Sequence, residues 1–344
     1  MSNMTPFSIQ KEMATGAWKP NIYLSNMAMA FFQEMSYFVA DQVFPVIPVQ
    51  LPSASYITFS KEDLMRDDVR KKPLYGSVDP AAIGNQSNTY NCEIDQLILG
   101  NDEFQAITFQ RSGIPGASDP RTGRVRTAVE KSKIHNDRIW AEKFFKPGVW
   151  VKDMEGTADA PGSDQFYQFD NGNSDPVRFV GNQIVEMKKE SSVKPNKIVL
   201  GAEVFVALQN HEAILERIKY QGSAANPASV TEKILAELFG VDKVVTAWAS
   251  YNKKPVGGSD IDFIVDPKGM LLTYAPDHAA IDVPSAGYTF AWDILGAGTH
   301  MALTQFKGPQ ATHTEYLEGI AAYDMKQTCK DLGFYFGKCV GSAE

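Results

Sequence analysis

The run "DQVFPVIPVQLPSASYITFSKEDLMRDD" (residues 41–68) constrains the fold more than any other stretch of the chain. Its prolines, Pro45, Pro48 and Pro52, exclude a helix and remove backbone donors, so the run must form an edge strand or a crossing segment. The residues "YITF" then favour a strand, which ends in a dense cluster of charges. An extended segment of this kind has little of its own domain to pack against.

The chain has 344 residues, which is too long for one ordinary core and indicates two or three lobes. Hydrophobic residues make up 44% and charged residues 22%, near the averages of globular proteins, which argues against wholesale disorder. The net charge of −8 argues against a protein whose main task is to grip nucleic acid. It remains compatible with one basic face turned toward an enclosed polyanion.

The three cysteines, Cys92, Cys329 and Cys339, form no CxxC pair or Cys/His cluster, which argues against zinc and predicts a reducing compartment. The N-terminus lacks the charged and apolar regions of a secretory signal, and no run of apolar residues is long enough to span a membrane. We therefore expect a soluble protein that is made in a cytoplasm.

Apolar periodicity predicts a helix over 22–43, after an extended arm. A strand over 46–60, a polar stretch over 61–91 and a strand in "TYNCEIDQLILG" predict a protruding hairpin with a long polar tip.

The segment 119–146 predicts a helix about 40 Å long, with Asp119 as N-cap and Pro120 at its first position. Pro147 and Gly148 end it. Its apolar stripe is thin, so we expect a strut that lies on a thin layer rather than a helix buried in a bundle.

A mixed α/β lobe follows this strut. We expect a helix opened by Pro176 and capped by Ser174 and Asp175, a buried strand in "NKIVLG" and one helix in "AEVFVALQNHEAILERI". The sequence "DIDFIVDPKGMLLTY" predicts a hairpin that turns at "DPKG", and a last β-rich stretch begins at Gly287.

The sequence contains no phosphate-binding loop, dinucleotide fingerprint or nucleophile elbow. Its five histidines stand outside any ligand spacing. Asp260, Asp262 and Asp266 resemble half of a calcium loop but lack the glutamate at the twelfth position. We therefore expect no catalytic residue, no cofactor and no metal site, and we interpret the chain as structural.

The strut segment is basic within an acidic protein, and two interpretations of its charge remain open. Either it is a solvated face with ion pairs, or its basic face, Arg124, Lys131 and Arg138, meets a packaged polyanion or a neighbouring subunit. From Arg121 onward it carries eight basic residues against three acidic ones: Arg121, Arg124, Arg126, Lys131, Lys133, Arg138, Lys143 and Lys146 against Glu130, Asp137 and Glu142.

The motifs "YFVADQVFPVIPV", "KEDLMRDD" and "GYTFAW", together with the order of the elements over roughly residues 20–340, resemble the major capsid proteins of tailed bacteriophages. These proteins have the Hong Kong 97-type fold. The resemblance implies an α+β chain with a sequence of named regions. They are the N-terminal arm and helix (1–45), the E-loop (46–112), the peripheral (P) domain (113–194) with its spine helix (120–146), the axial (A) domain (195–297) and a return to the P domain (298–344).

The resemblance implies that the arm and the E-loop pack on the next subunit, where their edge strands find packing partners that their own subunit does not provide. The E-loop residues expected at this contact are Lys61, Arg66, Asp67, Asp68, Arg70, Lys71 and Lys72. Some family members join subunits by a Lys–Asn isopeptide bond, but no motif here identifies an acceptor or a catalytic acid, so we do not transfer that chemistry. Met1 lies close before the first expected helix, so we expect no N-terminal scaffolding segment.

Two loops, "YQGSAANPAS" (220–229) and "YNKKPVGGSD" (251–260), are rich in Gly, Ser, Asn and Pro, as loops that gather around a symmetry axis must be. We expect axial contacts from Asn226, Lys253, Lys254 and Asp260, with Asp260 between neighbouring lysines. Two ordinary surface loops are the alternative.

The function implied is that of a major capsid protein whose hexamers and pentamers form the icosahedral shell around a phage double-stranded DNA genome. Its partners would be other copies of itself, the portal, scaffold or decoration proteins and, non-specifically, the packaged DNA. The alternatives are another virion protein, such as a decoration or tail protein, and an enzyme with an unfamiliar site.

Overall fold

A computed structural model of the chain describes residues 37–59, 65–72, 74–80, 84–104, 107, 120–221, 230–255, 257–279, 283–293 and 301–341. The expected arm and most of the helix predicted over 22–43 lie outside these residues. In the described part of that range, residues 37–39 are not helical, so the prediction is wrong there, and α3 (Ala40–Val43) is a short helix of its own. In the described regions none of the helices is long and apolar enough to cross a membrane.

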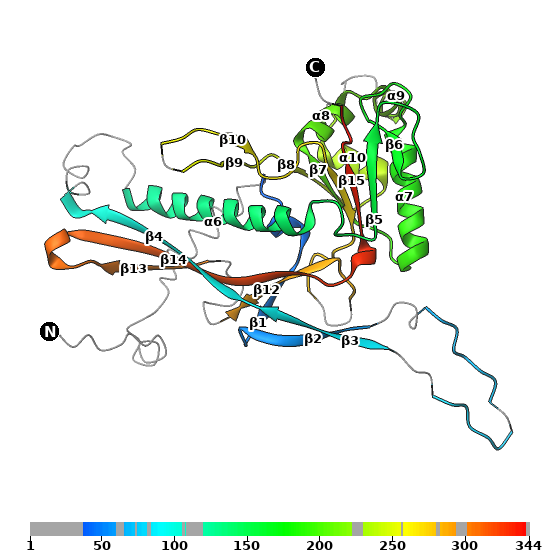
Figure 1. Cartoon of the computed structure of the whole chain (residues 1–344), viewed down its shortest axis with the longest axis horizontal. Helices are drawn as coiled ribbons and strands as arrows, with labels where there is room; N and C mark the ends of the chain where they lie inside the picture. The colour runs from blue at the N-terminus through cyan, green and yellow to red at the C-terminus, as the bar shows by residue number, and fades with distance from the viewer. Residues whose placement is uncertain are drawn as a thin grey trace.

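The first of the two large sheets forms the body of a mixed α/β lobe (Figure 1). Its six strands lie in the order β6-β5-β15-β11-β7-β8, with bounds Lys152–Thr157 (β5), Gln165–Tyr167 (β6), Lys197–Gly201 (β7), Lys243–Ala247 (β8), Met270–Thr273 (β11) and Gly333–Gly337 (β15). Four helices belong to this lobe: α7 (Pro176–Ser191), α8 (Ala202–Asn210), α9 (Glu212–Gln221) and α10 (Glu232–Phe239).

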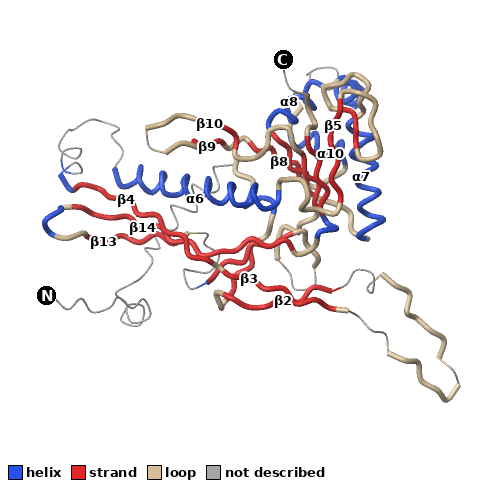
Figure 2. Tube along the Cα trace, viewed as in Figure 1, coloured by secondary structure: helices blue, strands red, loops and turns tan. Residues whose placement is uncertain are grey.

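The second sheet is long and twisted and lies beside the helix α6 (Figures 1 and 2). Its strands are β1 (Val46–Val49), β4 (Glu93–Asp102), β12 (Gly287–Trp292), β13 (Ala302–Lys307) and β14 (Thr314–Gln327). The long strand β14 connects the sheet because it pairs with β12, β13 and β4. Two short 3-10 helices, η2 (Gln310–Thr312) and η3 (Lys330–Leu332), flank it.

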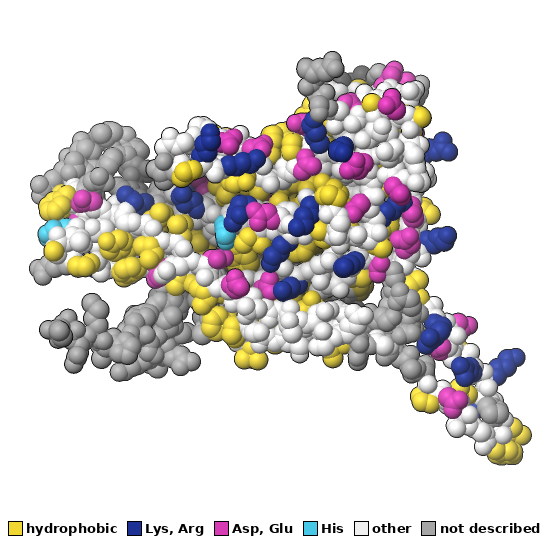
Figure 3. All heavy atoms as spheres, in the orientation of Figure 1, with side chains coloured by type: hydrophobic (Ala, Val, Ile, Leu, Met, Phe, Trp, Pro, Cys, Tyr) yellow, Lys and Arg dark blue, Asp and Glu magenta, His cyan; other side chains and the backbone are white. Residues whose placement is uncertain are grey.

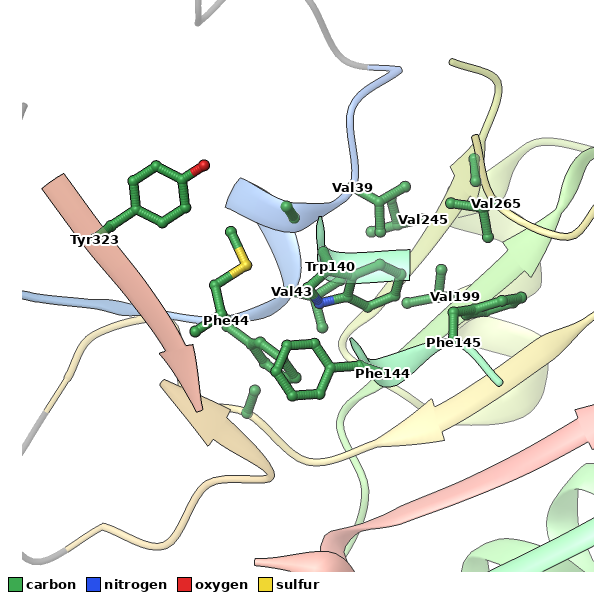
Figure 4. Close-up of a cluster of buried hydrophobic side chains, with 14 of the residues drawn as sticks. Val39, Val43, Phe44, Trp140, Phe144, Phe145, Val199, Val245, Val265 and Tyr323 are labelled. Atoms are coloured by element: carbon green, nitrogen blue, oxygen red, sulfur yellow. The ribbon is translucent and has the colours of Figure 1, made fainter. Parts of the chain in front are cut away.

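Helix α6 spans Pro120–Phe144 and confirms the predicted strut. Its C-terminal turns are more deeply buried than the thin apolar stripe indicated, since Trp140 and Phe144 belong to the main core. There they meet Phe44, with ring centroids 6.1 Å and 4.9 Å away (Figure 4). The helix is therefore a strut along the twisted sheet and a core element at the α/β lobe.

The six-stranded sheet is buried on both faces, which explains the unbroken burial of β7. Val199 points into the cluster of Trp140 and Phe145, whereas Ile198 and Leu200 point into a second cluster with α7 to α10. Side chains alternate across a strand, so an all-apolar strand requires cover on both sides. The end of α6 and helices α7–α10 supply that cover.

Two local predictions are confirmed by their hydrogen bonds. Asp175 accepts a bond from the backbone N–H of Arg178 at 3.1 Å and caps α7, which starts at Pro176 as predicted. The expected hairpin also forms, because β2 (Ser53–Phe59) pairs antiparallel with β3 (Asn85–Asn91). Its strands differ from those predicted, because the range 46–60 is divided between β2 and a first strand that pairs with β12, and most of "TYNCEIDQLILG" lies in the strand that pairs with β14.

Two other local predictions were wrong. The sequence after β7 forms two helices rather than one, because His211 adopts an extended conformation and its Nδ1 accepts the N–H of Ala213 at 3.2 Å, as an N-cap does. The turn in "DPKG" exists, with Gly269 N–H bonded to Asp266 oxygen, but it joins no hairpin. The strand before it, β10 (Ile261–Phe263), pairs with β9 (Ser250–Asn252), whereas β11 pairs with β7 and β15.

The predicted domain ranges remain a prediction, and the two sheets do not follow them in chain order. Strand β12, from the range 195–297, lies in the sheet of β14, whereas β15, from the range 298–344, lies in the sheet of β11. The chain therefore crosses between the two sheets near its end.

Candidate assembly interface

The β2–β3 hairpin stands away from the body of the molecule and leads into an extended segment (Figures 1 and 2). The two strands form a sheet of their own, with Ser53 opposite Asn91 and Phe59 opposite Asn85. An isolated two-stranded hairpin is marginal in water, so its base needs support.

That support comes from an aromatic cluster at the base of the hairpin. Tyr90 stacks on Phe290 of β12 with centroids 4.5 Å apart, and Tyr56 lies 5.3 Å from the same ring. The N–H of Asn91 also donates to Asp324 at 3.0 Å. The base is thus fixed to the twisted sheet, and this fixes the direction in which the tip projects.

Three of the charged tip residues that the sequence singled out, Arg66, Asp67 and Asp68, make hydrogen bonds within the loop. Arg66 Nε lies 2.8 Å from Asp68 Oδ1, and Asp67 accepts the N–H of Val69 at 3.1 Å. The hydrogen bond from Arg66 lowers the pKa of Asp68. Arg70, Lys71 and Lys72 are exposed, and Lys61 lies outside the described residues.

The sequence interpretation missed that this tip is also apolar. Val69 is 90% exposed, Leu74 86% and Tyr75 99%, and Met65 is exposed as well. Figure 3 shows the projecting segment ending in hydrophobic side chains beyond its mixed charges. Apolar side chains gathered at the end of a projection are typical of a binding surface. The signal was present in "PLYG" (73–76), where two large apolar residues stand in a loop.

The predicted basic face of α6 is present but only partly free. Arg124, Lys131 and Arg138 are spaced by seven residues and so share one side of the helix. Lys131 is exposed, whereas Arg138 pairs with Glu142 at 2.8 Å. Lys133, which the sequence interpretation counted with these basic residues, is 3% exposed and pairs with Asp41 at 3.8 Å. Figure 3 accordingly shows mixed charges over this helix rather than one basic patch.

Of the expected axial residues, Asn226 lies outside the described residues, and the others lie in the β9–β10 hairpin. Within the chain, Lys253 pairs with Asp262 at 2.6 Å. The carbonyl oxygen of Asp260 accepts the backbone N–H of Lys253 at 2.9 Å, and the expected place of Asp260 between lysines of neighbouring copies remains a prediction. The hydrogen bond to Asp262 raises the pKa of Lys253 and lowers that of Asp262.

In the view of Figure 1 the β9–β10 hairpin projects from the α/β lobe, whereas α9, which precedes the other expected axial loop, lies at the far end of that lobe. Lys254 is exposed on this hairpin. The axial role of these residues therefore remains a prediction. Within the described stretches, no three His, Cys, Asp or Glu side chains gather as metal ligands would.

Sequence comparison relates the chain to one curated protein. The major capsid protein of Burkholderia phage BcepMu is 24% identical over 281 residues, which cover 77% of this chain and 81% of that protein. No family model matches the chain.

Solved structures share the fold over nearly the whole length. A phage-related protein from Bordetella bronchiseptica RB50 has a TM-score of 0.68 and 18% identity, covering 93% of this chain and 97% of the other. The capsid of cyanophage P-SCSP1u has a TM-score of 0.53 at 9% identity, covering 87% and 88%. The mature capsid of bacteriophage PhiM1 has a TM-score of 0.51 at 12% identity, covering 88% and 87%.

The expected fold and the expected relationship are thus both confirmed, one by solved capsids and the other by a curated relative. The chain has the Hong Kong 97-type fold of solved phage capsids, and its sequence is similar to that of a phage major capsid protein.

Proposed function

We propose that copies of this chain assemble into hexamers and pentamers, which together form an icosahedral shell around a double-stranded DNA genome. The observation that carries this proposal is the β2–β3 hairpin with its apolar, uncovered tip. Leu74 and Tyr75 expose nearly all of their surface to water in the single chain, and they regain a favourable environment only against another molecule.

Other copies of the chain are the partner that we propose for this tip. A contact of one copy's hairpin with a different surface of the next copy is head-to-tail, and head-to-tail contacts close into rings such as hexamers and pentamers. The charges at Arg66 to Lys72 would then form the polar rim of an apolar contact.

The finer assignments belong to the same proposal. The chain would be synthesised in the cytoplasm of a bacterial host and would also meet the portal and scaffold or decoration proteins. Packaged DNA would be held non-specifically, and exposed basic residues of α6 such as Lys131 would contribute by long-range attraction.

The test is to purify the expressed full-length chain and to examine it by sedimentation and negative-stain electron microscopy. A capsid protein yields shells or isolated rings. A population that stays monomeric at high concentration, and also in the presence of co-expressed scaffold and portal proteins, would overturn the proposal.

A further inference from the structure

The β2–β3 hairpin is joined to the body of the molecule through two short segments. On one side residues 50–52 lead from β1 to β2, and on the other side Cys92 alone separates β3 from β4. The two strands of the hairpin form a sheet that is separate from both large sheets, so the strand ladders do not run through this joint. Other contacts at the base of the hairpin must therefore set its direction.

Two residues that face each other on neighbouring strands form the seat of the hairpin. Phe290 of β12 is paired with Asp324 of β14 in the ladder of the twisted sheet. Tyr90 stacks on Phe290 with ring centroids 4.5 Å apart. The next residue, Asn91, donates its backbone N–H to Asp324 Oδ2 at 3.0 Å. The end of β3 thus rests on one aromatic ring and one carboxylate.

The carboxylate of Asp324 is itself held in place by two lysines. Its Oδ1 lies 3.2 Å from Nζ of Lys143, in the last turn of α6, and its Oδ2 lies 3.1 Å from Nζ of Lys326. Asp324 is 8% exposed, and a carboxylate so far removed from water needs such partners. Because these contacts restrict its rotamers, Asp324 offers Asn91 an acceptor at a fixed position.

The two contacts of the seat differ in their physical nature. Stacking of Tyr90 on Phe290 removes apolar surface from water, an attraction that has no preferred direction of its own. A hydrogen bond to a carboxylate is stronger than one between neutral groups, and it weakens steeply as its angle departs from linearity. The aromatic ring therefore keeps the hairpin attached, whereas the carboxylate favours one direction over its neighbours.

A small change of direction at the seat becomes a large displacement at the far end of the hairpin. The 7 residues of β2 span about 24 Å, so a rotation of about 10° moves their far end by about 4 Å. A contact made beyond that end tolerates far smaller errors than this. The direction of the hairpin must therefore be fixed at its base.

We propose that Asp324 is a positioning residue that sets the direction in which the β2–β3 hairpin projects, acting through the backbone N–H of Asn91. Through Lys143 it also ties the hairpin to the end of α6, so the strut and the projection share one anchor. Phe290 contributes attachment but does not set the direction. This inference concerns the single chain, and its test does not require the proposed shell.

The test measures distances between the hairpin and the α/β lobe in the full-length, unassembled protein by double electron–electron resonance. Spin labels are attached at Ser87→Cys on β3 and Lys189→Cys on α7, both exposed, with Cys329 replaced by serine; the other two cysteines are buried. The protein with Asp324 should give one narrow distance distribution. Asp324→Ala should broaden it and should lower the hydrogen-exchange protection of the Asn91 amide by roughly tenfold or more.

A second variant removes the same hydrogen bond from its other side. Asn91→Pro lacks the N–H and leaves Asp324 with its lysines, so it should broaden the distribution as well. If Asp324→Ala does not fold cooperatively, Asn91→Pro decides. The matched control is Glu142→Ala, which removes an exposed carboxylate next to Lys143 and should leave the distribution narrow.

Phe290→Leu separates attachment from direction. It removes the stack with Tyr90 and should lower the melting temperature, but the distance distribution should stay narrow. An unchanged distribution in folded Asp324→Ala would overturn the proposal. Equal broadening in Phe290→Leu would also overturn it, because the seat as a whole would then set the direction.

Discussion

The Nζ of Lys197, on β7, lies 3.2 Å from the carbonyl oxygen of Val43, at the end of α3. It also reaches the carbonyl of Gln42 at 3.3 Å and pairs with Asp277 at 3.1 Å. Lys197 is buried, whereas Asp277 is exposed. At the start of the short helix, the carboxyl group of Asp137 on α6 accepts the N–H of Val39 at 2.9 Å and the N–H of Ala40 at 2.8 Å. Side chains from two other elements therefore hold both ends of α3.

Replacing Lys197 with methionine keeps most of the side-chain volume and removes the donor from two carbonyl groups. We expect the free energy of unfolding to fall by about 1–3 kcal/mol, because buried acceptors lose their partner. Chemical denaturation of the unassembled chain measures this. Lys189→Met, on the exposed side of α7, is the control and should change stability by no more than about 0.5 kcal/mol. Equal effects of the two variants would show that Lys197 is not a structural contact.

Glycines at two positions should respond in opposite directions to alanine. A Cβ at Gly333 would lie 2.1 Å from the ring of Trp150, so Gly333→Ala must displace a buried indole and should cost about 1–3 kcal/mol or more. A Cβ at Gly181, within α7, meets nothing within 4 Å, so Gly181→Ala should stabilise by about 0.5–1 kcal/mol. Thermal unfolding of both variants checks the pair, and a neutral Gly333→Ala would contradict the packing at Trp150.

Reversing the charge of the basic face of α6 should lower genome retention without preventing folding of the monomer. In the triple variant Arg124→Glu, Lys131→Glu and Arg138→Glu, the monomer should still melt cooperatively, since the Arg138–Glu142 pair is an exposed contact worth about 0.3–0.5 kcal/mol. The yield of DNA-filled particles should fall.

The control variant replaces three exposed lysines of α7 and α10 with glutamate, and it alters the net charge by the same amount. These lysines are Lys188, Lys189 and Lys233. If both triple variants retain DNA at the wild-type yield, the α6 face is only a solvated surface. If both lose DNA equally, net charge rather than position is responsible.

Deleting residues 66–86 should leave a folded monomer that cannot form shells, because the deleted segment projects from the body and its described residues are mostly exposed. A finer variant, Leu74→Ser with Tyr75→Ser, should weaken assembly in the same direction without shortening the loop. The matched control is Val185→Ser with Val206→Ser, which removes two exposed apolar side chains elsewhere. Light scattering after size-exclusion chromatography measures assembly, and normal shells from the deletion would show that the hairpin is dispensable.

Local signals explain which parts of the fold could be predicted. Two strand patterns separated by a polar stretch predicted the β2–β3 hairpin, in which the strands follow one another along the chain. Asp175 followed by Pro176 predicted the start of α7, because a helix cap depends on neighbours in sequence. Strand order depends on distant partners, so the placement of β15 between β5 and β11 could not be read from the chain. The contact that holds the start of α3 is equally remote, since Asp137 and Ala40 are 97 residues apart.

The interface was predicted in part. The charges from Arg66 to Lys72 indicated the correct loop as the candidate interface. Because that prediction considered only charged residues, it missed the exposed apolar tip formed by Leu74 and Tyr75. On α6, the sequence could not distinguish the exposed Lys131 from the buried Lys133. Residues two positions apart on a helix lie on opposite sides, and only the tertiary fold decides which of these sides is covered.

The most direct test of the central claim, that the hairpin of one copy binds the next copy in a shell, is a cryo-electron microscopy map of assembled particles at side-chain resolution. We expect the segment 61–90 to bury more surface on a neighbouring copy than on its own chain, with Leu74 and Tyr75 covered by that neighbour. A map in which this segment folds back on its own chain, or projects into solvent within an intact shell, would contradict the account.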